Sequence, residues 1–329
     1  MPPQLTSPMP RLASYAPLKS LAALVVLVIA LSVTTDKFAT VDNGLNVLRQ
    51  ISVNLCLSIG MTLVILSGGI DLSVGSVLAL AGAVAASCLK KGLVFAALGF
   101  EVHFNAIGAV AVGLLVGAAL GAVNGQLITR LKLPPFVATL AMLSIARGLT
   151  MLHTGGYPLT GLGESFARIG AGSLLRIPNP AWITAGLVVL FHILTQHTRW
   201  GRHLYAVGGN ERAALLSGVN VGRTKRITYI LCGALAGLAG VLVAARLDSA
   251  TPNAGVGYEL DSIAAVVIGG ATLSGGRGTV LGAVLGCLLI GVLNNGLVLL
   301  QVSPFWQQVI KGLVILIAVA IDQASKRQE

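Results

Sequence analysis

The stretch ILSGGIDLSVGSVL, residues 65–78, places one acidic residue, Asp71, inside a run of apolar and small residues. Gly68 and Gly69 precede the aspartate, and Ser73 follows it. Glycines commonly end a helix, and aspartate commonly caps the start of the next one. The stretch therefore predicts two apolar helices joined by a short reversal.

The composition of the whole chain is that of a membrane protein. Of its 329 residues, 55% are hydrophobic and only 10% are charged, with a mean hydropathy of +0.87, whereas a soluble domain has about 25% charged residues. The long apolar runs show no alternation of period two, so we expect them to span the membrane as helices rather than as strands of a barrel. The predicted fold class is an all-α membrane protein.

The apolar runs divide the chain into about ten expected transmembrane helices. They are residues 19–35, 47–66, 72–88, 105–129, 135–152, 181–198, 224–246, 261–273, 279–300 and 304–321. The predicted transmembrane domain is therefore 19–321, with a cytoplasmic N-terminal segment at 1–18 and a cytoplasmic tail at 322–329. The eighth run is short enough to be a half-helix, and we interpret residues 90–104 as an external interfacial stretch.

The positive charges give the orientation. If both termini are cytoplasmic, thirteen of the 22 Lys and Arg residues lie on the inner side and six on the outer side. Cytoplasmic loops of membrane proteins carry such an excess. The net charge of +11 is therefore a signal of topology, and we expect no nucleic-acid partner.

The largest inner loop, residues 199–223, contains a short predicted helix from Asn210 to Gly218. Asn210 is a good cap, Glu211 lies in the first turn, and Gly218 follows the last turn. Its apolar side chains are Ala213, Leu215 and Leu216. Since we expect nothing else in the loop to form a core for this helix, it should dock on another protein. The alternative is a helix that rests on the lipid headgroups.

Two patterns occur twice. GGIDLSVG at 68–75 resembles GGATLSGG at 269–276, and NGQLITRLKLPPF at 124–136 resembles NGLVLLQVSPF at 295–305. Many transporters consist of inverted repeats that enclose the binding site. In the predicted topology the second pair lies on opposite faces, as inversion requires, but the first pair lies on the same face. An inverted internal repeat therefore remains one of two open interpretations, the other being chance.

Leu-Ser-Gly-Gly, at 66–69 and 273–276, also resembles the start of the signature of ATP-binding-cassette ATPases. The sequence contains no G-x-x-x-x-G-K-[ST] phosphate loop, so we expect no nucleotide site and no enzymatic activity. The glycines are expected to allow close packing or sharp reversal. The five His residues show no ligand spacing, and the four Cys residues lie in apolar runs, so we expect no metal, no cofactor and buried free thiols.

Asp71 admits three interpretations. It can cap the third helix by accepting the N–H groups of Ser73 or Val74, or it can belong to a broken helix, at Gly68 and Gly69, that exposes polar groups to a translocation path. Direct proton transfer is the third, and it is disfavoured because no chain of intramembrane acids or histidines follows.

Amide side chains are the other polar groups expected inside the spans. The candidates for the translocation pathway are Gln50, Asn54, Asn124, Asn294 and Asn295. Gln50 and Asn54 are separated by four residues and share a helix face. Uncharged donors and acceptors suit a neutral polyol better than an ion, but hydrogen bonding between helices is the alternative role.

Several motifs together carry a family resemblance. They are GMTLVILSGGIDLSVGS (60–76), PFVATL (135–140), AVGGNERAALLSGVNV (206–221), GYELDSIAAVVIGGATLSGGRGT (257–279) and NNGLVLL (294–300). In these motifs the chain resembles the membrane permeases of ribose-type ATP-binding-cassette sugar importers, from about residue 45 to 322. The resemblance implies a type II-like importer permease that carries a monosaccharide, expected to be ribose, across a bacterial inner membrane.

The same resemblance implies the partners. They are a second permease copy, a cytoplasmic ATPase with two nucleotide domains in one chain, and a periplasmic sugar-binding protein. The helix at Asn210–Gly218 would be the coupling helix, with Glu211, Ala213, Ala214 and Gly218 matching the importer pattern. Arg212 interrupts the usual Glu-Ala-Ala run, which puts the docking contacts in question. The competing hypothesis is a secondary transporter of a small polar solute driven by an ion gradient.

Overall fold

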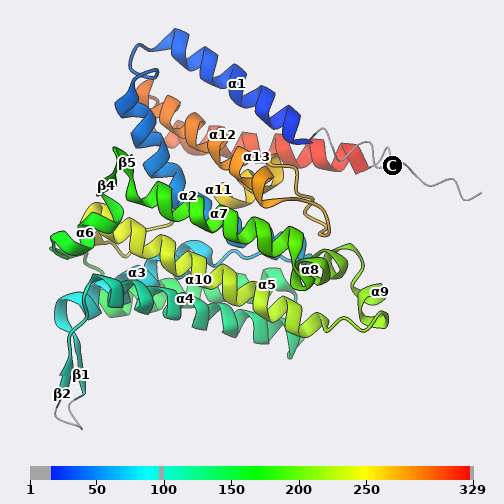
Figure 1. The fold of residues 1–329 in the computed structure, drawn as a ribbon, viewed down its shortest axis with the longest axis horizontal. Helices are drawn as coiled ribbons and strands as arrows, with labels where there is room; N and C mark the ends of the chain where they lie inside the picture. The colour runs from blue at the N-terminus through cyan, green and yellow to red at the C-terminus, as the bar shows by residue number, and fades with distance from the viewer. Residues whose placement is uncertain (1–15, 96–99, 327–329) are drawn as a thin grey trace, which may run out of the picture.

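The computed structural model describes residues 16–95 and 100–326, and these form a helical bundle (Figure 1). The helices are α1 (Ala16–Thr34), α2 (Val41–Leu66), α3 (Val74–Lys91), α4 (Ala106–Thr129), α5 (Pro135–Thr154), α6 (Glu164–Gly170), α7 (Asn179–His197), α8 (Arg199–Gly209), α9 (Glu211–Leu216), α10 (Val221–Leu247), α11 (Tyr258–Ile268), α12 (Val280–Leu299) and α13 (Pro304–Lys326). The strands are β1 (Leu93–Phe95), β2 (Phe100–Val102), β3 (Leu159–Thr160), β4 (Ser173–Leu174), β5 (Ile177–Pro178) and β6 (Ser249–Ala250). The strands form three short antiparallel pairs, β1 with β2, β3 with β6, and β4 with β5. The predicted all-α class is confirmed.

Each of the ten apolar runs coincides with a helix, but fewer helices are long and apolar enough to cross a membrane. Six described helices meet that requirement (α2, α3, α4, α5, α10 and α12), and α7 with α8 would make a seventh, bent by 71°. The apolar parts of α1 and α13 are shorter, at Ser20–Thr34 and Pro304–Ile317, and α11 has only 11 residues. The count of about ten spans is therefore not confirmed and stays a prediction.

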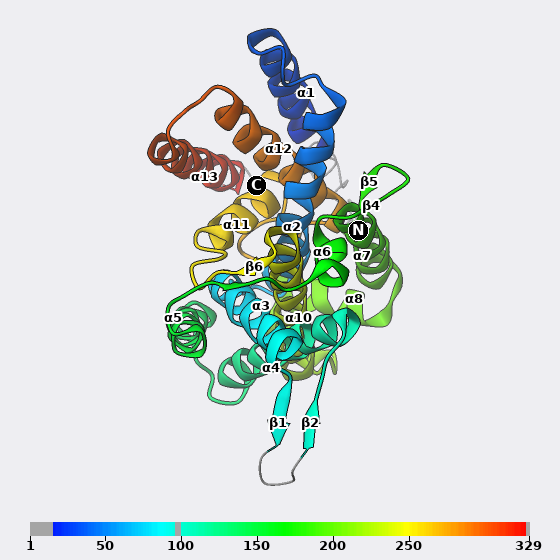
Figure 2. The ribbon, with the colours of Figure 1, turned by 90° about the vertical axis from the view of Figure 1, so that its left-hand side faces the viewer.

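The centre of the bundle consists of α2, α3 and α10, as Figure 2 shows from one end. Glycines bring α4 and α3 into backbone contact with α10. A Cβ on Gly117 of α4 would lie 2.1 Å from the carbonyl oxygen of Gly233 on α10, and one on Gly82 of α3 would lie 2.9 Å from that of Gly240. Small residues permit such close approach in membranes, where packing rather than water drives helix association.

The two ends of the bundle differ (Figure 1). One end carries α8 and α9, and the other carries α6, the β4–β5 pair and the β1–β2 hairpin, which projects beyond α3 and α4. Within the stretch 90–104 the described strands are β1 and β2, and its interfacial location stays a prediction. The basic residues assigned to the inner side by sequence make the α8–α9 end the expected cytoplasmic end.

The first and last helices extend beyond the expected first and last spans. α1 begins at Ala16, before the expected start at residue 19, and α13 continues to Lys326, beyond the expected end at 321. Residues 1–15 of the predicted N-terminal segment and 327–329 of the predicted tail lie outside the described residues. All four cysteines are buried and free, as expected from their apolar surroundings.

Candidate functional site

The reversal between α2 and α3 surrounds Asp71 with donors. α2 ends at Leu66, Gly68 has φ +79°, and Ser73 precedes the first residue of α3. The Asp71 side chain is 1% exposed. Its Oδ1 atom accepts a 2.9 Å bond from the Ser73 N–H and a 2.6 Å bond from the Ser73 hydroxyl. Of the two N–H groups expected to bond Asp71, those of Ser73 and Val74, the structure has the bond to Ser73, but the cap residue of α3 is Ser73 itself rather than Asp71.

Three further residues enclose this carboxylate from other helices. Asn124 of α4 donates from Nδ2 to the Ser73 Oγ at 3.0 Å, so Ser73 links α4 to Asp71. On α10, the Cys232 side chain lies near Asp71, and the buried Tyr229 hydroxyl lies beside Gly69 without a hydrogen-bond partner in the described part of the chain. Of the candidate pathway residues, Asp71, Ser73 and Asn124 therefore form one buried cluster.

The predicted docking helix is present as α9. The Asn210 side chain caps it by accepting from the Ala213 N–H at 2.9 Å, and Gly218 follows it with φ +81°. Leu215 and Leu216 are 62% and 82% exposed. The capping and the exposed apolar surface agree with the sequence analysis.

One expectation about this loop was wrong, because the loop does supply a core for the helix. Residues 199–209 form the amphipathic helix α8, and its Val207 packs with Ala214 of α9 and Val221 of α10. The buried side chain of α9 is thus Ala214. An ion pair of 2.6 Å between Glu211 and Lys225 also ties α9 to α10, while Arg212 is exposed.

The two Leu-Ser-Gly-Gly segments meet next to α8, a contact that the sequence analysis did not predict. The Gly276 N–H donates to the Leu66 carbonyl at 3.1 Å. A Cβ on Gly275 would lie 2.9 Å from the Cα of Gly68, and one on Gly208 of α8 would lie 1.7 Å from the Leu66 oxygen. We call these backbone contacts the glycine junction (Leu66–Gly69, Gly208–Gly209 and Leu273–Gly276). It joins α8 directly to the reversals after α2 and α11.

The remaining amides lie apart from the Asp71 cluster. Asn295 of α12 forms a reciprocal amide pair with Asn43 of α2, at 3.0 and 2.9 Å. The Asn294 Oδ1 is buried without a partner in the described structure. Gln50 and Asn54 are half-buried on α2. The pair formed by Asn295 is the helix-linking role that the sequence analysis kept as the alternative.

The sequence analysis missed an ion pair that lies near the end of the bundle opposite to α8 and α9. Lys311 of α13 and Asp261 of α11 are 2.9 Å apart, with side chains 29% and 5% exposed. Arg147 of α5 donates to the carbonyl oxygens of Pro252 and Ala254, at 2.5 and 3.0 Å. The signal available in the sequence was one basic residue inside each of the two apolar runs.

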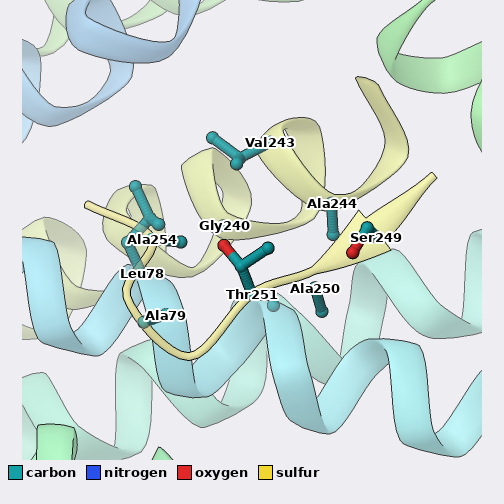
Figure 3. Close-up of a pocket in the computed structure, with 10 residues that line it drawn as sticks. Leu78, Ala79, Gly240, Val243, Ala244, Ser249, Ala250, Thr251 and Ala254 are labelled. Atoms are coloured by element: carbon teal, nitrogen blue, oxygen red, sulfur yellow. The ribbon is translucent and has the colours of Figure 1, made fainter. Parts of the chain in front are cut away.

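The loop that Arg147 binds crosses the contact between α3 and α10 (Figure 3). Thr251 and Ala254 of the loop, with Leu78 of α3 and Val243 of α10, line a cavity of about 10 Å³. A cavity of about this size holds at most one water molecule. It cannot hold a sugar, so it is not a substrate site.

Comparison with known proteins defines the class of this chain. Residues 43–319 match the model of a family described as the permease component of branched-chain amino acid transport systems. Since this match covers most of the chain, the protein belongs to that family of membrane permeases. It is thus a multi-pass membrane subunit of a transport system.

Individual relatives narrow the comparison. The ribose import permease protein RbsC of Escherichia coli K12 is 50% identical over 308 residues, 92% of each chain. The protein of the same name from Bacillus subtilis is 48% identical over 302 residues, 91% of this chain and 90% of its own. The D-allose transport system permease protein AlsC of E. coli K12 is 38% identical over 292 residues, 89% of this chain and 86% of its own. No solved structure matches the chain.

Proposed function

We propose that this protein is the permease subunit of an ATP-binding-cassette importer that carries ribose across a bacterial inner membrane. The observation that carries the proposal is the identity of about half of all residues, over nine-tenths of the chain, to permeases named for ribose import. The allose permease, at 38%, is more distant. Gln50 and Asn54, the half-buried amides on α2, agree with a neutral polyol as cargo.

The energy comes from a separate cytoplasmic ATPase that docks on α9 through Leu215, Leu216 and Arg212. Support comes from the exposure of these side chains and from the anchoring of α9 by Ala214 and by the Glu211–Lys225 pair. α9 follows directly after α8, and the glycine junction joins α8 to the reversal that holds Asp71. Movement of α9 by the ATPase would therefore be transmitted to that reversal through backbone contacts.

The other partners are a periplasmic sugar-binding protein, which delivers ribose, and a second copy of this chain. α5 and α13 are the surfaces that we assign to the second copy. Support comes from their exposed apolar side chains, which include Leu149 at 44% and Leu313 at 53%, and from Gly148 and Gly312, where nothing lies within 4 Å of an added Cβ. Ten spans per copy and a tandem-domain ATPase belong to the same proposal.

The test is affinity isolation of the chain from its native membrane, followed by reconstitution of the recovered assembly in vesicles. We expect a tandem ATPase and a periplasmic sugar binder to co-purify, and labelled ribose uptake to require ATP, the ATPase and the binder. Allose in place of ribose should be carried poorly.

Two outcomes would contradict the proposal. Uptake by the chain alone that collapses with a protonophore while ATP is held constant would establish an ion-gradient transporter. ATP-dependent uptake of another sugar, with no ribose uptake, would preserve the importer and overturn the cargo.

A further inference from the structure

A groove opens beside α8 at the basic end of the bundle. It has a volume of about 530 Å³ and lies between the end of α7, the face of α8 and the first turns of α10. Of the residues that line it, only Gly218 belongs to the coupling segment Asn210–Gly218, and none belongs to the Asp71 cluster.

The polar end of the groove carries unpaired donors. Arg223 and His203 line it and are exposed, and no ion pair or side-chain hydrogen bond of Arg223 occurs among the described residues. The Trp200 ring also lines the groove. An exposed guanidinium without a partner matches an anionic headgroup, because a phosphate oxygen accepts charge-assisted hydrogen bonds from it.

The other end of the groove is apolar and includes residues of α10, one of the helices long and apolar enough to span a membrane. Leu194 of α7 and Ile227 and Leu231 of α10 line it. Leu231 is eight residues beyond Arg223 on one helix, which is about 12 Å along its axis. Next to Leu194, Ile193 is 48% exposed. The groove thus changes from cationic to apolar in the direction in which a phospholipid changes from headgroup to acyl chain.

We propose that this groove binds one anionic phospholipid of the cytoplasmic leaflet, with its phosphate at Arg223 and an acyl chain on Ile227 and Leu231, beside the Trp200 ring. Basic pockets between transmembrane helices on this side of a membrane suit such headgroups, and Trp is favoured at headgroup depth. Because the groove adjoins α8, the lipid would stabilise the helix that carries α9.

The test uses the fluorescence of Trp200 to report lipid binding in the groove. The sequence has three Trp residues, so Trp182→Phe with Trp306→Phe leaves Trp200 alone. The full chain is placed in phosphatidylcholine vesicles with increasing amounts of chain-brominated phosphatidylglycerol or, separately, chain-brominated phosphatidylcholine. We expect half-quenching of Trp200 at an about five-fold lower mole fraction of the anionic lipid, the effect of one basic side chain near such a lipid.

Matched variants distinguish lipid binding in this groove from general electrostatic attraction of anionic lipids to the basic end of the protein. Arg223→Gln should remove the preference for the anionic lipid and Arg223→Lys should keep it. Arg130→Gln, an exposed basic position in another loop at the same end, should leave it unchanged. In the parent protein, high salt should weaken the preference. Equal quenching by the two lipids, quenching by neither, or a preference that survives Arg223→Gln would overturn the proposal.

Discussion

The Gly276 N–H donates to the carbonyl oxygen of Leu66, and these two residues close the reversals that follow α11 and α2. Gly208 of α8 lies against both, because a Cβ at that position would be 1.7 Å from the Leu66 oxygen and 2.6 Å from the Gly276 nitrogen. The contact between three segments far apart in sequence thus depends on the absence of a side chain at Gly208 and also at Gly275.

Gly208→Ala is expected to separate α8 from the two reversals. Overpacking at such a contact costs about 1–3 kcal/mol, and ATP-driven uptake should fall because the route from α9 is displaced. Thermal unfolding and uptake in vesicles measure the two effects. Gly209→Ala is the control, since nothing lies within 4 Å of a Cβ there. If the two variants have the same unfolding temperature and the same uptake, the glycine junction does not transmit movement from α9.

Ser73→Ala should destabilise the Asp71 cluster. The substitution removes the hydroxyl that donates to Asp71 and accepts from Asn124. Leaving buried polar groups unpaired costs about 1–3 kcal/mol each. The loss is measured as a lower unfolding temperature in detergent. An unchanged temperature would mean that water or another side chain replaces the hydroxyl.

Asp71→Asn separates the charge of this residue from its hydrogen bonds. The amide keeps an oxygen for the Ser73 N–H, so we expect the variant to fold, but with lower uptake than the parent because the Ser73 hydroxyl faces a weaker acceptor. Folded yield and ribose uptake are measured together. Parent levels of both would show that the charge is dispensable.

Glu211→Ala with Arg212→Ala should uncouple ATP hydrolysis from uptake. The Glu211–Lys225 pair is partly exposed, and such pairs contribute about 1 kcal/mol or less to stability, so the chain should fold and assemble. ATP hydrolysis and uptake are then compared in the same vesicles. If uptake is unchanged with assembly intact, α9 does not couple the two.

Lys311→Met should destabilise the chain, because it leaves the Asp261 carboxylate, 5% exposed, without its cation. Removing one partner of a buried pair costs about 3 kcal/mol or more. Lys311→Met with Asp261→Asn should regain most of this loss, since no unpaired charge remains. Thermal unfolding of both variants tests this, and equal losses would show that the pair is not what stabilises this end of the bundle.

The features predicted correctly from the sequence are local ones. The bond from the Ser73 N–H to Asp71 and the cap at Asn210 join residues two or three positions apart, and residue types alone define such motifs. The membrane class followed from composition. Asn124 reaches Ser73 across 51 positions and Lys311 reaches Asp261 across 50, and no local pattern specifies either contact.

Helix α8 was missed for a different reason. Its sequence, RWGRHLYAVGG, contains three glycines and three polar or basic residues near its start, which is typical of a loop. The helix forms because Leu204 and Val207 are buried against the bundle and because Gly208 permits the backbone contact. Tertiary packing here overrides helix propensity. The number of spans stayed open because α1, α11 and α13 have short apolar parts.

The burial of Cys56, Cys88, Cys232 and Cys287 has a practical consequence for spectroscopy. Maleimides attack accessible thiolates, and buried thiols are inert to them. A cysteine introduced at Tyr157, which is 77% exposed and lies outside the docking surface of α9, should take a fluorophore or spin label on the otherwise native sequence. The motion of this position during turnover can then be followed without first constructing a cysteine-free background.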